Sequence, residues 1–136
     1  MPRFVLLVVL ILLAACSQYA GKSPQEAFEE FYKRFHEDTD YQIAHITFPL
    51  EGLPSHADVE TITTNDFKWE KEDWEVHRPF NFENSDFVRE VIPFGDDLMV
   101  EKIIHKSGEY GTIRRFARLG EEWYLIYYAG LNRIEQ

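Results

Sequence analysis

The last third of the chain constrains the fold most, because it reads as three consecutive strands with tight turns between them. Residues 98–106, 112–119 and 122–129 are rich in β-branched and aromatic side chains, which favour strands. Residues 107–109 (Ser-Gly-Glu) and 120–121 (Gly-Glu) separate them, and both segments have the length and composition of hairpin turns. We therefore predict a three-stranded antiparallel meander.

The final strand of this meander is apolar on both faces. Under regular alternation its residues divide into two sets, one for each face: Trp123, Leu125, Tyr127 and Ala129 against Tyr124, Ile126 and Tyr128. A sheet with one solvated face should instead alternate apolar with polar residues. We expect a helix to cover one face and either the curved sheet itself or a second subunit to cover the other.

An amphipathic helix is predicted over residues 24–37. Ser23 and Glu26 form a capping box, and Pro24 occupies the first helical position, which together mark a helix start. Four aromatic residues follow on one stripe at helical spacing: Phe28, Phe31, Tyr32 and Phe35. Such a stripe is typical of core packing, and a ligand cleft is the alternative interpretation.

The middle of the chain carries weaker signals. A short second helix is expected over residues 41–46, capped by Asp38 or Asp40, before an extended segment around Pro49. Three uneven strands are then predicted from alternation, over residues 59–69, 74–82 and 86–94.

Helices followed by a curved antiparallel sheet resemble the nuclear transport factor 2-like, or cystatin-like, cone. The sequence also resembles a family of uncharacterised bacterial lipoproteins with that fold, which carry a domain of unknown function. The matching residues span most of the chain: Phe28, Phe31, Phe35, Asp38, Tyr41-Gln42, Phe48-Pro49-Leu50 and residues 116–125. The resemblance implies an α+β cone, with helices on a curved antiparallel sheet, and implies no established activity.

The chain begins with a segment that reads as a targeting signal. Arg3 precedes an apolar run of twelve residues, which as a helix would rise about 18 Å, too little for a hydrocarbon core of about 30 Å. Leu13, Ala14, Ala15 and Cys16 resemble the lipobox of bacterial lipoprotein signal peptides. The resemblance implies cleavage before Cys16 and its acylation with palmitate-type chains, which would anchor the protein stably. An ordinary secretory signal with an incidental cysteine is the alternative.

This interpretation divides the chain into three parts: a signal peptide (1–15), a lipidated tether (16–22) and one domain (23–136). It places the protein in the bacterial cell envelope, and Ser17 after the cysteine favours the periplasmic face of the outer membrane. The formal net charge of −10 repels phosphate backbones, so nucleic acid is not an expected partner. The expected partners are the membrane through the lipid anchor, a small apolar ligand or envelope protein, and a second copy through the sheet face.

Several polar residues are candidates for chemistry. His36, Asp38 and Asp40 alternate as a metal site might require, but residues two apart on a helix point in different directions, so no metal is expected. His45 or Asp40 is a candidate general base with Tyr32 or Tyr41 as proton donor. For His45, and also for His105, an ordinary structural role is the preferred interpretation.

Two charged clusters complete the candidates. Residues 69–75 (WEKEDWE) place acids beside two tryptophans, which suits a sugar site, although a solvated edge is preferred. Arg114, Arg115 and Arg118 concentrate positive charge, for pairing with nearby acids or for an anionic ligand. Phosphate-loop, nucleophile-elbow and paired metal-ligand motifs do not occur, and no cofactor is expected. We therefore expect a non-catalytic binding module, with a small isomerase- or dehydratase-type enzyme as the alternative.

Overall fold

The computed structural model describes residues 21–134. Cys16, the lipobox residues before it and most of the predicted tether lie outside the described residues, so these expectations remain predictions. Within the described range, no helix has the length and apolarity needed to cross a membrane.

The N-terminal part of the described chain forms two helices, α2 (Pro24–Glu37) and α3 (Thr39–Ala44). The predicted bounds of α2 are confirmed, and the Ser23 hydroxyl accepts a hydrogen bond from the Glu26 N–H at 3.2 Å. For α3 the capping residue is Asp38, which accepts from the Tyr41 N–H at 3.0 Å. The helix therefore starts and ends two residues earlier than expected.

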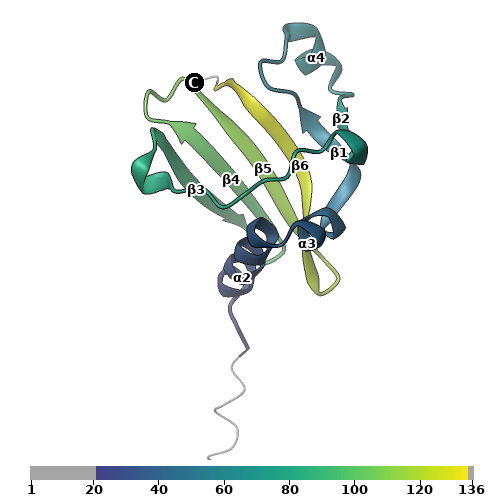
Figure 1. Ribbon diagram of the computed structural model, residues 1–136, viewed down its shortest axis with the longest axis vertical. Coiled ribbons are helices and arrows are strands. Elements are labelled where there is room, and N and C mark those ends of the chain that lie inside the picture. The colour runs from purple at the N-terminus through teal and green to yellow at the C-terminus, as the bar shows by residue number, and fades with distance from the viewer. Residues whose placement is uncertain (1–20, 135–136) are drawn as a thin grey trace, which may run out of the picture.

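Six strands form one curved sheet in the order β2-β1-β6-β5-β4-β3 (Figure 1). Their bounds are β1 Ile46–Leu53, β2 Lys68–Trp69, β3 Phe87–Phe94, β4 Leu98–His105, β5 Tyr110–Leu119 and β6 Glu122–Arg133. The meander β4-β5-β6 was predicted, and Gly108 and Gly120 adopt the positive φ angles that its two turns require. The sheet is mixed rather than wholly antiparallel, because β1 runs parallel to β6.

The predicted strands of the middle region are mostly wrong. Residues 59–69 contain the helix α4 (Val59–Thr64) and only the two-residue β2. Residues 74–82 form no strand, and 86–94 matches β3. The alternating pattern gave a wrong prediction for residues 59–64 because Asp58 caps α4, accepting from the Thr61 N–H at 2.8 Å. This local hydrogen bond outweighs the strand preference of the β-branched residues. Two short 3₁₀ turns, Lys71–Asp73 and Phe82–Asn84, complete the region.

Residues 74–86, here named the strap, cross the sheet on their way to β3, on the same side as α2 and α3 (Figure 1). The core lies between α2 and the sheet, where Phe28 meets Phe116 and Trp123, each with ring centroids 5.3 Å apart. Phe35 and Phe116 are fully buried, and each large side chain so buried contributes about 1.5–3 kcal/mol. The buried apolar residues of the described chain all fall within 28–129.

The two faces of β6 differ from strict alternation. The register between β5 and β6 shifts between Arg115 and Phe116, which marks a bulge that reverses the later side chains. Leu125 and Tyr128 therefore share the inner face, whereas Tyr127 pairs with Arg115 on the outer face. On that outer face Val88 and Phe94 are 55% and 58% exposed.

Candidate functional site

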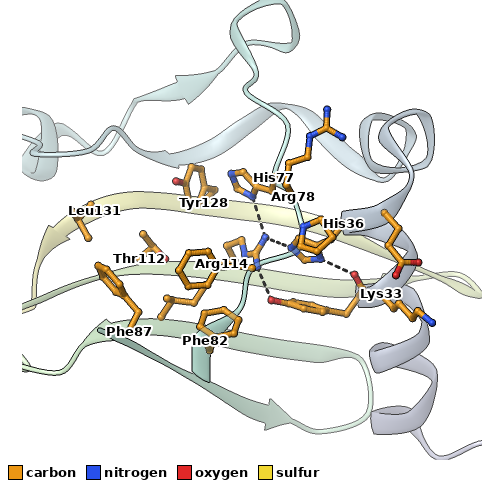
Figure 2. Close-up of a pocket in the computed structure, with 15 residues that line it drawn as sticks. Lys33, His36, His77, Arg78, Phe82, Phe87, Thr112, Arg114, Tyr128 and Leu131 are labelled. Carbon is orange, nitrogen blue, oxygen red and sulfur yellow. Dashed lines mark hydrogen bonds between the residues drawn. The ribbon is translucent and has the colours of Figure 1, made fainter. Parts of the chain in front are cut away.

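The sheet, α2 and the strap line a cavity of about 510 Å³ that is open to solvent (Figure 2). The cone is therefore partly hollow, with this cavity beside the packed aromatic core. Its wall is largely apolar and aromatic: Phe80, Phe82, Phe87, Ile103, Tyr128 and Leu131. The volume lies in the range of small-molecule sites, which combine apolar walls with a few convergent polar groups.

Arg114 on β5 is the centre of the polar floor. It is 4% exposed, and its guanidinium reaches three different elements (Figure 2). Nη1 donates to His36 Nε2 at 2.9 Å and to His77 Nδ1 at 3.0 Å, while Nη2 donates to the Tyr32 hydroxyl at 3.0 Å. One arginine thus joins α2, the strap and the sheet.

The charge of Arg114 is balanced by Glu101 on β4, which is fully buried. Arg114 Nε donates to Glu101 Oε1 at 2.6 Å, and Arg89 Nε donates to Oε2 at 2.8 Å. Burial alone would raise the pKa of Glu101, but the charge of Arg114 and the hydrogen bonds from both arginines hold that pKa below its usual range. The carboxylate is therefore ionised and pairs with both arginines, and Arg89 also pairs with Glu29 at 3.3 Å.

Both histidines of the floor are neutral at physiological pH. Burial lowers the pKa of His36 to about 4 and of His77 to about 3, and the charge of Arg114 acts in the same direction. Hydrogen bonds also assign the tautomers. His36 donates from Nδ1 to the Tyr32 carbonyl at 2.7 Å and accepts at Nε2, whereas His77 accepts at Nδ1 and so carries its proton on Nε2.

Tyr32 links the aromatic stripe of α2 to this floor. Its ring lies beneath the guanidinium of Arg89, whose central carbon is 3.8 Å from the ring centroid. Burial raises the pKa of Tyr32 to about 12, so the hydroxyl stays protonated. Core packing was predicted for all four aromatic residues of the stripe: three of them are in the core, and Tyr32 packs against that core while also forming part of the cavity wall.

Gln42 holds the strap in place. Its amide nitrogen donates to the carbonyl of His77 at 2.7 Å, and its amide oxygen accepts from the His77 N–H at 2.9 Å and the Trp74 indole at 3.1 Å. Gln42 is fully buried, so these bonds form in a medium of low dielectric, where they are strong. They position His77 against Arg114.

Of the four predicted catalytic candidates, only Tyr32 lines the cavity. Asp40 is exposed, and Tyr41 stacks on His45 with centroids 3.8 Å apart. His45 is buried in that stack. Its Nδ1 donates to the Tyr41 carbonyl at 2.8 Å, and its Nε2 lies 3.5 Å from a Glu122 oxygen. His45 and Tyr41 therefore lie together outside the cavity lining, and neither predicted base accompanies Tyr32 there.

The other predicted clusters have structural partners. The described residues contain no group of three side chains suited to a metal ion, and His36 faces Arg114 rather than the two aspartates. Trp69 and Trp74 both donate their indole N–H groups to protein oxygens. Among the three arginines, Arg118 pairs with Asp97 at 2.7 Å and only Arg114 lines the cavity.

Sequence reasoning missed His77 and Glu101 as members of the site. The one signal available for Glu101 was its place in β4, where a charged residue occupies the register of the inward-facing Met99 and Ile103. His77 had no local signal, because its place depends on a bond to Gln42 across 35 residues.

No protein-family model matches the chain, and no curated protein matches it. Among solved structures it is similar to a nuclear transport factor 2-like protein from Bacteroides fragilis, with a TM-score of 0.52 and 13% identity over 87% of this chain and 50% of that one. This chain therefore spans about half the length of that protein. The likeness shows the fold alone.

Two further structures are more distant. A putative calcium/calmodulin-dependent kinase II association domain from Exiguobacterium sibiricum has a TM-score of 0.47 and 10% identity, over 85% of this chain and 97% of that one. A nuclear transport factor 2-like protein of unknown function from Pseudomonas putida has a TM-score of 0.39 and 14% identity, over 80% and 87%. The α+β cone predicted from the sequence is confirmed.

Proposed function

We propose that this chain is a lipid-anchored cell-envelope protein whose cone domain binds a small, largely apolar molecule. The observation that carries the binding role is the cavity of about 510 Å³ with its aromatic wall and polar floor. Apolar walls supply affinity by removing ligand surface from water, and a few polar groups fix its orientation.

Binding fits the floor better than proton transfer does. A general base works best when its pKa lies near the operating pH, whereas the pKa values of His36 and His77 are about 4 and about 3. The Glu101 carboxylate is engaged by two arginines. These groups are therefore well placed to donate and accept hydrogen bonds, and poorly placed to abstract a proton.

Titration with the neutral fluorescent dye Nile red tests the binding role. Wild type should bind the dye saturably, and Thr112→Phe should abolish that binding because Thr112 lines the cavity. Thr63→Phe, on the exposed side of α4, is the matched control and should bind as wild type does. Dye binding that is equal in all three proteins would contradict the proposal.

The anchor rests on the lipobox, and fractionation tests it. The wild-type chain should sediment with membranes of the outer-membrane fraction, and Cys16→Ala should shift it to the soluble periplasmic fraction. Ser17→Ala is the control and should leave the distribution unchanged. A Cys16→Ala protein that stays in the membrane fraction would remove the anchor from the proposal.

A second copy of the chain is the partner we propose for the outer face of the sheet. Val88 and Phe94 are more than half exposed there, and exposed apolar patches commonly mark interaction sites. Sedimentation equilibrium should give a dimer for wild type and a monomer for Phe94→Glu. A wild-type monomer at high concentration would exclude this partner.

A further inference from the structure

We propose that the ligand of the cavity is an apolar monocarboxylate, whose carboxylate group binds Arg114 and His77 while its apolar body lies along Phe80, Phe82 and Phe87. This inference rests on the proposed binding function and names the class of ligand.

The floor retains two hydrogen-bond donors for a ligand. A guanidinium has five N–H groups, and the partners of Arg114 are Glu101, His36, His77 and Tyr32, which leaves one N–H on Nη2. His77 accepts at Nδ1, so its Nε2–H is a donor with no partner among residues 21–134. Arg114 and His77 both line the cavity, and each of these N–H groups can donate to an oxygen of a bound carboxylate.

The charge of the site also favours an anion. Behind the floor, Arg89 and Arg114 share the carboxylate of Glu101, and Arg89 also pairs with the half-exposed Glu29; both histidines are neutral. Of the charged residues that line the cavity, Lys33, Arg78 and Arg114 are cations and Glu37 is the one anion. The cavity is thus locally positive in a chain whose formal net charge is −10, and a singly charged ligand balances the floor.

The wall determines the rest of the ligand. Phe80 and Phe82 contact each other at 4.8 Å between ring centroids, and Phe80 is 56% exposed although it lines the cavity. Covering this ring with a ligand would remove its apolar surface from water. A polar body, such as a sugar, would leave its hydroxyl groups unpaired against these rings.

Isothermal titration calorimetry with decanoate, decanol and decylamine tests the assignment. The protein is the chain from residue 17 onward, which includes every buried apolar residue of the described range, with its fold verified by circular dichroism and a cooperative urea transition. Decanoate should bind at least about tenfold more tightly than decanol, since hydrogen bonds to a charged group are about twice as strong as neutral ones. Decylamine should bind more weakly than both.

His77→Asn separates the head-group contact from the integrity of the floor. The asparagine oxygen can replace Nδ1 as the acceptor for Arg114, but its amide N–H₂ lies short of the position that Nε2–H occupies in histidine. Decanoate affinity should therefore fall about tenfold or more, while decanol affinity stays unchanged. His105→Asn is the matched control, because His105 bonds Ser107 at 2.9 Å outside the cavity lining, and it should bind decanoate as wild type does.

The outcomes distinguish the carboxylate assignment from the proposed binding function on which it rests. Equal affinities for decanoate and decanol, or an unchanged affinity in His77→Asn, would overturn the carboxylate assignment while leaving a cavity that binds apolar molecules. Failure of all three probes and of Nile red to bind would overturn both.

Discussion

Replacing Glu101 by glutamine should severely destabilise the fold. The side chain keeps its shape, but the two arginines that share its carboxylate, at 2.6 and 2.8 Å, lose their buried counter-charge. One oxygen also becomes an amide N–H₂ that faces an arginine donor. Glu29, at 3.3 Å from Arg89 Nη2 and half-exposed, compensates little because it is solvated.

The magnitude follows from the burial of this group. Removing one partner of a buried ion pair typically costs about 3–5 kcal/mol, and Glu101 is fully buried between two cations. A domain of this kind is stable by only about 5–15 kcal/mol. Glu101→Gln should therefore lose about a fifth or more of the free energy of unfolding.

Urea denaturation followed by tryptophan fluorescence measures the effect. The midpoint should fall while the m value stays constant, which would show that stability changed and compactness did not. Glu90→Gln on β3 is the matched control, since Glu90 is exposed and its substitution should cost less than about 0.5 kcal/mol. A Glu101→Gln cost below about 1 kcal/mol would refute the claim that this carboxylate neutralises the buried arginines.

Three further outcomes follow from the same contacts. The free energy of unfolding should fall as pH decreases from 6.5 towards 4, because His36 and His77 take up protons in the unfolded chain and not in the folded floor. At about pH 4.5 each imidazole should lower this free energy by about 2–3 kcal/mol. Urea midpoints plotted against pH over this range should show a shallower slope when His36 and His77 are both replaced by asparagine. A slope equal to that of wild type would contradict the assignment of the pH dependence to these two histidines. Gln42→Leu should lower the free energy of unfolding by about 2–4 kcal/mol, because it leaves the His77 backbone unpaired. Amide hydrogen exchange in the strap should become faster, and exchange protection equal to wild type would contradict the role of Gln42 in holding the strap. Gly52→Ala should cost about 1–3 kcal/mol or more, because its Cβ would overlap the Tyr128 carbonyl, and an unchanged urea midpoint would show that β1 and β6 can separate freely.

Local chemistry explains which elements could be predicted. The helix at 24–37 has its own cap and apolar stripe, and the hairpins of β4-β5-β6 have turns at Gly108 and Gly120. Each of these signals acts between residues close in sequence. The parallel pairing of β1 with β6 joins residues about 76–79 positions apart, and no local pattern encodes such a contact.

The candidate site was predicted only in fragments. Tyr32 was a candidate proton donor, His36 belonged to an alternating pattern for which no metal was expected, and Arg114 was a basic residue that pairs with acids or binds an anion. The structure brings these residues together with His77 and Glu101 around one guanidinium. It excludes His45 and Asp40, whose surroundings lie elsewhere in the fold.

The amino-acid sequence by itself determined the aromatic helix, the closing meander and the α+β class, because caps, turns and periodicity act over a few residues. Tertiary structure decided that the cone is partly hollow and that its floor is a cation rather than an acid-base pair. The reason is that the charge state of a buried group depends on burial and on its partners. Arg114 finds those partners 78 residues away in His36, 37 in His77 and 13 in Glu101.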